Sequence, residues 1–362
     1  MVPSRKSATR LVRCAAAVGP QGESMRFDNV SILSVEHVDA PHCLSSAEIE
    51  ERLAPAIRRL GVRPNLLQEL SGIVERRLWD PGTTPSEPAT WAGERAIEAA
   101  GIDRSRIGVL VNTSVSRDYL EPSTGCAVHH GLSLSEDCVN FDVSNACLGF
   151  VNGMDVVGNM IERGQVDYGI VVNAESSRPL IEATIPRLLD ESLDAVTFRN
   201  NFASLTLGSG AVAMVLARSG LAANGHRYLG GVSLAATENC RLCCGNMDHM
   251  VTDTQALTEA GLRLAHRTWQ RAAELLGWTI DRHAHYVQHQ VSRGHAEKFA
   301  AILGLDMDKV YRLYPTYGNV GPAGIAIVLS KLEKERIVDP GDRVALMGIG
   351  SGINCTMAEI VW

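Results

Sequence analysis

A glycine-rich turn that leads into an apolar strand pattern occurs twice in this chain, and no other feature limits the possible fold as strongly. The first copy covers residues 207–216 (LGSGAVAMVL) and the second covers residues 348–361 (GIGSGINCTMAEIV). Before each copy, strand patterns alternate with helix patterns, which is typical of α/β proteins whose sheets are covered on both faces. The repeat therefore predicts two similar α/β halves that divide near residue 220, where Asn224-Gly225 supplies a turn.

Several segments carry periodic patterns of apolar residues. Strands are expected at residues 30–38, 109–114, 141–144 and 168–173, and helices at 45–60, 91–100, 122–130, 147–163 and 325–332. We expect Ser46 to cap the helix at 45–60 and Pro122 to open the helix at 122–130. The helix at 147–163 has apolar residues on nearly every face, so it should be buried on all sides.

Residues 1–24 differ from the rest of the chain. Four basic residues occur before the first acidic one, Glu23, and Arg13 interrupts the only apolar stretch. A secretory signal needs an unbroken apolar core, so we expect an N-terminal extension without fixed structure; a transit-like peptide, or a start at Met25, stays open. The predicted halves then cover residues 25–220 and 221–362.

Composition argues against several function classes. The chain has 362 residues, of which 45% are hydrophobic and 21% are charged, and its net charge is −7 without any basic block in its body. A nucleic-acid partner is therefore not expected. No apolar run reaches the roughly eighteen residues that a membrane-spanning helix needs. Nine cysteines, an odd number scattered along a long chain, favour free thiols in a reducing compartment, so we expect a cytoplasmic protein.

Cys240, Cys243 and Cys244 form a short cluster that could be taken for a metal site. Structural zinc needs four ligands, usually two spaced pairs, and no second pair lies nearby in the sequence. We expect neither a bound metal nor a bound cofactor.

Cys147 is the first candidate for catalysis. It lies in the segment 141–150 (FDVSNACLGF), where a short strand pattern turns directly into a long apolar helix. At the first turn of a helix, the macrodipole and the free N–H groups favour thiolate over thiol, which makes a nucleophile able to form a thioester. From this segment alone, a small buried cysteine that only fills space is the alternative.

Three further segments could complete a site around Cys147. His289 ends a short strand pattern, and Asn319 lies in a glycine-flanked turn where its amide could donate a fixed hydrogen bond to a carbonyl oxygen. In the turn Gly350-Ser351-Gly352, the backbone N–H of Ser351 could complete an oxyanion hole opposite that of Cys147. Taken singly, His289 is typical of a core or surface histidine, Asn319 of a helix cap and the glycines of a tight turn.

Taken together, these segments resemble the thiolase superfamily, and especially its ketoacyl-ACP synthase III branch. The order is Cys147, His289-Gln290, Gly318-Asn319-Val320-Gly321 and the C-terminal glycine turn, and the similarity covers essentially residues 26–362. Segments 112–124, 145–148, 289–293 and 357–362 resemble in particular the condensing enzymes of bacterial long-chain olefin biosynthesis. The resemblance implies the thiolase fold, in which two similar α/β halves form a layered α-β-α-β-α structure.

The resemblance also implies a reaction that needs acyl-CoA substrates and no cofactor. Cys147 would take an acyl group from one acyl-CoA, and His289 and Asn319 would polarise the carbonyl of a second. Glu121 would remove a proton from the α-carbon, reaching from one subunit of a homodimer into the site of the other. The β-ketoacyl product would be hydrolysed to a β-keto acid, the first intermediate toward an olefin or related hydrocarbon, and further β-keto-acid-processing enzymes would consume it.

Glu121 separates this reaction from its main alternative. A decarboxylating synthase III forms its carbanion by loss of CO₂ from malonyl-ACP, whereas two ordinary acyl-CoAs require removal of a very weakly acidic α-proton. Without the resemblance, Glu121 is typical of a solvated residue at a helix start. A third interpretation is a supporting subunit that lends only Glu121 to a paralogous chain in β-lactone biosynthesis, and the joint presence of Cys147, His289 and Asn319 argues against it.

Overall fold

The computed structural model describes residues 24–246 and 248–362, so the expected extension at residues 1–24 lies outside the described residues except for Ser24. Most strands belong to one large sheet: β1 (Met25–Arg26), β2 (Val30–Asp39), β5 (Ile107–Asn112), β6 (Val139–Asp142), β7 (Tyr168–Glu175), β8 (Gly210–Arg218), β9 (His226–Ala235), β12 (His285–Gln288), β13 (Arg343–Gly350) and β14 (Asn354–Val361). Their order is β12-β13-β14-β9-β2-β8-β7-β5-β6, and β1 pairs with β9.

The two ends of this sheet repeat one pattern of strand directions. In the first half, β5 and β7 are parallel, β8 is antiparallel to β7, and β2 is antiparallel to β8. In the second half, β12 and β13 are parallel, β14 is antiparallel to β13, and β9 is antiparallel to β14. The two glycine turns of the sequence lead into β8 and β14, which are matching strands. The faint sequence repeat therefore corresponds to a structural one.

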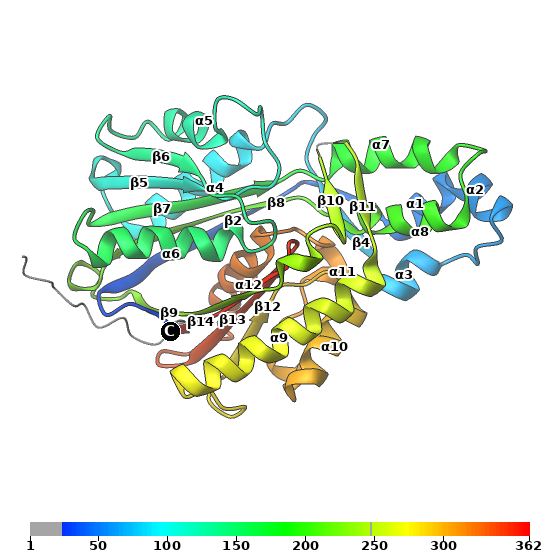
Figure 1. The fold of residues 1–362 in the computed structure, drawn as a ribbon. Helices are drawn as coiled ribbons and strands as arrows, with labels where there is room; N and C mark the ends of the chain where they lie inside the picture. The colour runs from blue at the N-terminus through cyan, green and yellow to red at the C-terminus, as the bar shows by residue number, and fades with distance from the viewer. Residues whose placement is uncertain (1–23, 247) are drawn as a thin grey trace, which may run out of the picture.

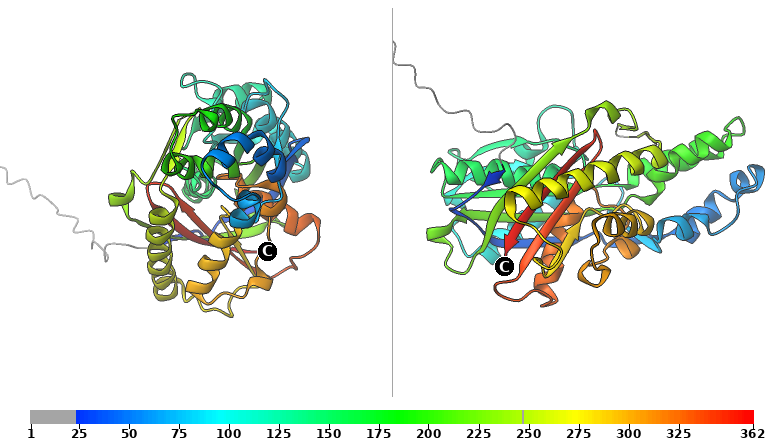
Figure 2. Two further views of the ribbon diagram at one scale, coloured as in Figure 1. Left: turned by 90° about the vertical axis from the view of Figure 1, so that its right-hand side faces the viewer. Right: turned by 60° about the horizontal axis from the view of Figure 1, so that its bottom comes forward.

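Helices form three layers around the two half-sheets (Figures 1 and 2). The outer face of the first half is covered by α4 (Ser86–Ala100) and α5 (Thr124–Gly131), and that of the second half by α9 (Thr254–Leu276) and α10 (Arg293–Leu303). Between the half-sheets lie α6 (Gly149–Glu162) and α12 (Ala323–Lys334), whose apolar side chains form the central core. This is the expected α-β-α-β-α layering of the thiolase fold.

A group of shorter elements extends beyond one end of the sheet, on the right-hand side of Figure 1. It contains α1 (Ser46–Arg52), α2 (Ala54–Arg59), α3 (Leu66–Ser71), α7 (Arg178–Leu189), α8 (Ala195–Asn201) and the strand pairs β3 (His42–Ser45) with β4 (Glu75–Leu78) and β10 (Cys243–Gly245) with β11 (Met250–Thr252). Leu53, Ile185 and Phe198 belong to its separate apolar core. The remaining helices are α11 (Tyr314–Tyr317), η1 (Arg104–Arg106), η2 (Phe202–Thr206), η3 (Ser219–Leu221), η4 (Thr237–Asn239) and η5 (Met307–Lys309).

The helix predicted at residues 45–60 is wrong in two respects. The cap is Ser45 instead of Ser46, and the segment forms two helices that meet at Leu53. Pro55 explains the interruption, because proline lacks the N–H that an uninterrupted helix would use at that position. Within the described ranges, no helix has both the length and the apolar character needed to cross a membrane.

Candidate active site

Cys147 lies in the turn between β6 and α6, beside the central helix layer. Contrary to the prediction, it precedes α6 instead of lying in its first turn, because Leu148 is the N-cap residue. Ala146 has a left-handed φ of 45°. A residue with a Cβ is strained in this region by about 1–2 kcal/mol, so neighbouring contacts must hold the turn.

The predicted stabilisation of a Cys147 thiolate is wrong. Burial, together with the nearby groups Cys243 and Glu175, raises the pKa of the Cys147 thiol to about 12, and the backbone N–H of Cys147 lowers it by less. Removal of the sulfur from water therefore outweighs the effect of the helix end. A thiol of this kind needs a base that accepts its proton during attack.

Glu175, at the end of β7, lies near Cys147 and was missed by the sequence analysis. Its carboxyl group accepts hydrogen bonds from the backbone N–H groups of Val115 (2.8 Å) and Ser116 (3.1 Å). Burial raises the pKa of Glu175 to about 7, although these hydrogen bonds oppose the rise. A charged residue at the end of a fully buried, mostly apolar strand was the available signal.

His289 directly follows β12, at the strand's carboxyl end as predicted. Its backbone N–H donates to the Met347 carbonyl of β13 (2.9 Å). His289 therefore lies beside β13, the strand that leads to the glycine turn at residues 350–352. Its side-chain Nδ1 is buried and has no hydrogen-bond partner within the described part of the chain. Burial, with a smaller effect of His295, lowers the pKa of His289 to about 3. The imidazole is therefore uncharged at neutral pH and can accept a proton.

Asn319 lies between α11 and α12 and is fixed through its backbone. Its N–H donates to the Thr206 carbonyl (2.9 Å), and its carbonyl accepts from the Gly208 N–H (2.9 Å). This close approach requires glycine at 208, because a Cβ there would lie 1.7 Å from the Tyr317 carbonyl oxygen. The side-chain Oδ1 accepts from the Gly321 N–H (3.0 Å), which leaves the amide NH₂ as the donor for a ligand.

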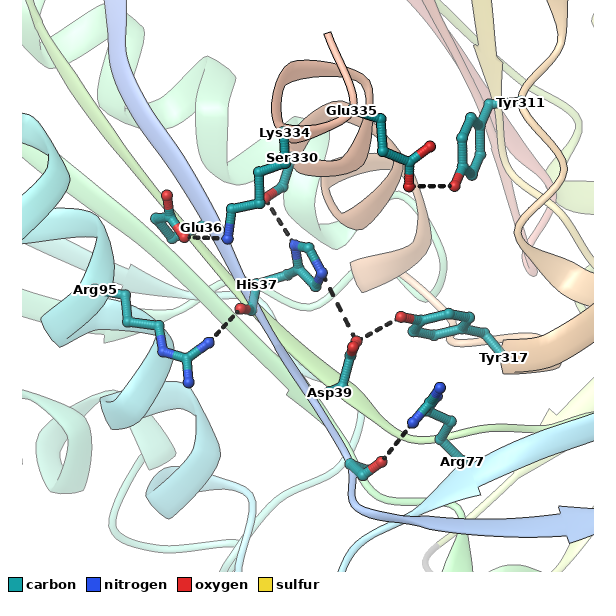
Figure 3. A network of polar contacts seen from close by, with 11 residues as sticks. Glu36, His37, Asp39, Arg77, Arg95, Tyr311, Tyr317, Ser330, Lys334 and Glu335 are labelled. Atoms are coloured by element: carbon teal, nitrogen blue, oxygen red, sulfur yellow. Dashed lines mark hydrogen bonds and ion pairs between the residues drawn. The ribbon is translucent and has the colours of Figure 1, made fainter. Parts of the chain in front are cut away.

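Tyr317, two residues before Asn319, anchors this segment to β2 (Figure 3). Its hydroxyl donates a 2.5 Å hydrogen bond to Asp39 Oδ1. His37 Nδ1 lies 2.7 Å from Ser330 Oγ of α12, and His37 Nε2 lies 3.7 Å from Asp39 Oδ1. The position of Asn319 is therefore set by contacts that join β2 of the first half to α11 and α12 of the second.

The predicted oxyanion turn connects β13 to β14 and lies against the Cys147 turn. A Cβ on Gly350 would be 3.2 Å from the Asn145 carbonyl oxygen and 3.4 Å from the Cys147 nitrogen. The backbone N–H groups of Cys147 and Ser351 therefore belong to two neighbouring segments, one from each half of the chain.

Glu121 is exposed, unlike the buried side chains of His289 and Asn319. It lies in the loop between β5 and α5, and its neighbours Tyr119 and Leu120 are 66% and 90% exposed. Large apolar side chains exposed to this degree on a short loop indicate a contact surface.

Both ends of the Glu121 loop are fixed. Glu175 holds its first residues, and Asp142 of β6 accepts hydrogen bonds from the backbone N–H groups of Thr124 (3.1 Å) and Gly125 (2.8 Å) at its end. The cap of α5 is Ser123, so Pro122 precedes the helix instead of opening it as predicted. The loop therefore projects from the protein, and the carboxylates of Glu175 and Asp142 hold its two ends.

The cysteine cluster lies close to this site. Cys243, on β10, is near enough to Cys147 to raise the pKa of the Cys147 thiol. Cys240 and Cys244 are exposed. Among the residues that the structure describes, no group of three or more potential metal ligands comes together.

Two family models match the chain. Residues 141–235 match 3-oxoacyl-(acyl-carrier-protein) synthase III, and residues 273–362 match the C-terminal part of the same synthase. The first match contains Cys147, and the second contains His289 and Asn319.

Curated relatives narrow this assignment. The acyl-CoA:acyl-CoA alkyltransferase of Xanthomonas campestris is 49% identical over 338 residues, which cover 93% of this chain and 100% of the relative. The chain belongs to the acyl-CoA:acyl-CoA alkyltransferase family of the thiolase superfamily. The alkyltransferase of Shewanella oneidensis is 34% identical, with the same 93% and 100% coverage. The protein is accordingly an acyltransferase, a condensing enzyme of this superfamily.

Two solved structures have the same fold. Xanthomonas campestris OleA with bound cerulenin superimposes with a TM-score of 0.93 at 48% identity, covering 95% of this chain and 100% of OleA. A synthase III, FabH, from Xanthomonas oryzae gives a TM-score of 0.92 at 49% identity, with 93% and 100% coverage.

Proposed function

We propose that this alkyltransferase-family enzyme joins two fatty acyl-CoA molecules head to head, without decarboxylation, and releases a β-keto acid. This would be the first step toward a long-chain olefin or a related hydrocarbon. The observation that carries the proposal is the anchored loop that projects Glu121, because a decarboxylating synthase needs no such carboxylate. Substituted forms of OleA change a glutamate, a cysteine and a histidine with the same order and spacing as Glu121, Cys147 and His289. OleA has also been solved with lauric acid and lauroyl-CoA.

The first half-reaction acylates Cys147. The sulfur attacks the thioester carbonyl, a new carbon–sulfur bond forms, and the bond to CoA breaks. In this proposal the uncharged His289 takes the thiol proton as the sulfur attacks and returns it to the departing CoA. The N–H groups of Cys147 and Ser351 would bind the carbonyl oxygen.

The second half-reaction forms the carbon–carbon bond. His289 and Asn319 polarise the carbonyl of the second acyl-CoA, and Glu121 of the partner subunit takes its α-proton. The resulting enolate attacks the acyl group on Cys147, and the carbon–sulfur bond breaks to release the thiolate. The proton that Glu121 removed balances the one that the thiolate takes up, so both groups return to their starting states. Water then cleaves the β-ketoacyl-CoA to CoA and the β-keto acid.

A second copy of this chain is the partner that the proposal requires. β6 is the last strand of the large sheet and pairs with β5 alone, and its first residue, Val139, is 52% exposed. The exposed side chains Tyr119 and Leu120 belong to the neighbouring loop. Pairing through this edge would cover these apolar groups and would bring Glu121 toward the other subunit.

A narrow apolar seam next to Asn319 marks a candidate path for an acyl chain. A narrow apolar cavity between the helices of the extension is lined by Leu53, Ile57, Phe198, Phe202 and Leu205, among others. Leu205 directly precedes Thr206, whose carbonyl accepts the Asn319 N–H. We place the path of one substrate's alkyl chain along this seam, whose helices must separate to admit it.

The proposal also includes a cytoplasmic location and no cofactor. The cysteines at described positions are free thiols, which supports a reducing compartment. A β-keto acid loses CO₂ readily, so we expect a following enzyme that processes it.

The decisive experiment incubates the purified protein with myristoyl-CoA and no malonyl donor. We expect release of CoA, an acyl adduct on Cys147 by intact mass, and a β-keto acid or its decarboxylated ketone. Cys147→Ala should lose the adduct, whereas the matched variant Cys243→Ala, which removes the neighbouring thiol, should keep it. An absolute requirement for malonyl-ACP would instead support the decarboxylating synthase, and a chain that never becomes acylated would support the role of a supporting subunit.

A further inference from the structure

The turn that carries Cys147 is tied to both halves of the chain through one amide, that of Asn145. Its Nδ2 donates to Asn152 Oδ1 on α6 (2.7 Å), and its Oδ1 accepts from Asn354 Nδ2 at the start of β14 (3.1 Å). Asn145 is two residues before Cys147, and Asn354 is three residues after Ser351. A single side chain therefore connects the nucleophile to the segment that carries the oxyanion N–H.

The polar chain continues into the central core. The side chain of Asn152 contacts the carboxyl group of Asp155, one turn later on α6. The hydroxyl of Tyr228 on β9 donates a hydrogen bond to Asp155 Oδ1 (2.6 Å). Asp155 Oδ2 has no hydrogen bond of normal geometry to any described residue, so the contact with Asn152 is a weak one. Asp155 and Tyr228 are 4% and 0% exposed. The inner end of the chain is thus fixed in a close-packed layer.

The Cys147 turn needs such support because Ala146 is strained. The strain from its left-handed φ is of the same order as the stabilisation that two hydrogen bonds contribute. The turn's own backbone bonds, from Leu148 N–H to Asn145 O (3.0 Å) and from Gly149 N–H to Ala146 O (3.1 Å), define its shape. They do not fix its position relative to β14.

We propose that Asn145, held by Asn152 and Asn354, is a positioning residue that sets the separation between the Cys147 sulfur and the backbone N–H of Ser351. The inference rests on the proposed function, because it assumes that Cys147 attacks a carbonyl whose oxygen binds this N–H. If the hydrogen bond to Asn152 or the one to Asn354 is removed, the Asn145 amide can rotate. The distance between the Cys147 sulfur and the Ser351 N–H is then no longer fixed.

The test compares two reactions of the Cys147 sulfur in the full-length protein. Acyl transfer from myristoyl-CoA, followed by intact mass in a single turnover, uses the oxyanion donors, whereas alkylation by iodoacetamide does not. Asn152→Leu and Asn354→Ala should each lower the acyl-transfer rate at saturating substrate about 10- to 100-fold and leave alkylation within about twofold of the unmodified protein. The double variant should be little worse than the poorer single variant, because both changes act through Asn145.

Two further variants separate positioning from general damage. Asn152→Asp keeps an acceptor for Asn145 Nδ2 and should restore most of the acyl-transfer rate. Asn159→Ala, on the exposed side of α6, should match the unmodified protein in both reactions. Thermal melting of every variant reports on folding, and if one substitution prevents folding, the other carries the comparison.

The two possible failures give different results. Unmodified protein that accepts no acyl group contradicts the proposed function and this inference with it. If the unmodified protein is acylated, two results overturn the positioning role alone. In one, the folded variants are acylated equally fast; in the other, their acyl transfer and their alkylation are slowed equally.

Discussion

Glu175 and Ser116 are joined by two hydrogen bonds, from the backbone N–H (3.1 Å) and from the hydroxyl (2.9 Å) of Ser116 to the same carboxyl oxygen of Glu175. This pair connects the end of β7, beside Cys147, to the start of the loop that carries Glu121. In the proposed dimer, Glu175 therefore lies beside Cys147 of its own subunit. It also anchors the loop whose Glu121 acts in the site of the partner subunit.

Glu175→Gln should change the pH dependence of stability. Burial raises the pKa of Glu175 from its unfolded value near 4.5 to about 7, so the folded state favours the protonated form. Its contribution is fully present below pH 4.5 and is lost as the pH rises through 7, by on the order of 3 kcal/mol. Glutamine keeps an acceptor but does not titrate, so urea unfolding of the variant between pH 4.5 and 7.5 should show a smaller loss of stability. An unchanged slope would contradict the assignment. Burial also raises the pKa of Asp155 to about 7. Asp155 should therefore contribute the same pH dependence of stability in the variant as in the unmodified protein.

Mixed dimers test whether Glu121 acts across the subunit interface. Glu121→Ala and Cys147→Ala should each abolish condensation alone, with Glu121→Ala still acylated. Co-expressed with different tags, the two should regain about a quarter of normal β-keto acid formation, because half of the dimers contain one complete site out of two. If Glu121 served its own subunit, no complete site could form and no activity would return.

Tyr317→Phe removes the hydrogen bond that anchors the Asn319 segment to Asp39. We expect a loss of about 1 kcal/mol in the free energy of unfolding and a slower condensation step, with acylation of Cys147 less affected. Tyr311→Phe is the matched control, because it removes a 2.9 Å hydrogen bond to Glu335 instead of the one to Asp39 (Figure 3). Equal loss of condensation in both variants would contradict the link between Tyr317 and Asn319.

Glu359 should make the fold sensitive to acid. Burial alone would raise the pKa of Glu359, but the contacts of its carboxylate with His283 and Arg282 lower it to about 2. The stabilisation is present above the unfolded pKa near 4.5 and is lost as the pH falls toward 2, by on the order of 3 kcal/mol. Glu359→Gln should therefore be less stable at pH 7 and should lose less stability on acidification, as measured by guanidinium unfolding. Glu333→Gln, which affects a more exposed pair with His226, should change neither value by much.

Phe198→Val tests the cavity assigned to an acyl chain. Each buried methylene is worth about 0.8 kcal/mol, or roughly fourfold, so a longer cavity should shift preference toward longer acyl-CoAs. We expect the kcat/KM ratio of palmitoyl-CoA to lauroyl-CoA to rise severalfold. Phe299→Val, in the core around α10, should lower stability without changing this ratio.

Strongly periodic elements could be predicted from the sequence. The long apolar pattern after Cys147 corresponds to α6, and the predicted helix at 91–100 ends at Gly101 as expected. The single sheet through both halves could not be predicted, because strand partners such as β2 and β9 are chosen by long-range packing and not by local pattern.

The candidate site shows the same division. Cys147, His289 and Asn319 were predicted because each occupies a turn or strand end in an order that resembles one known family. Asn145 was not found, because its partner Asn354 is 209 residues away in the sequence. The thiolate prediction for Cys147 failed because it considered the helix end, which is local, and not burial, which depends on the assembled fold.

Met25 and Arg26 form β1, which pairs with Gly231 and Gly230 of β9. From the opposite end of the chain, α12 packs on β2 and β8. A polypeptide cut near residue 220 would consequently yield two fragments that each leave an apolar face bare. Expressed separately, they should aggregate; produced in the same cell, they should assemble into a working enzyme whose two pieces stay together without a covalent link.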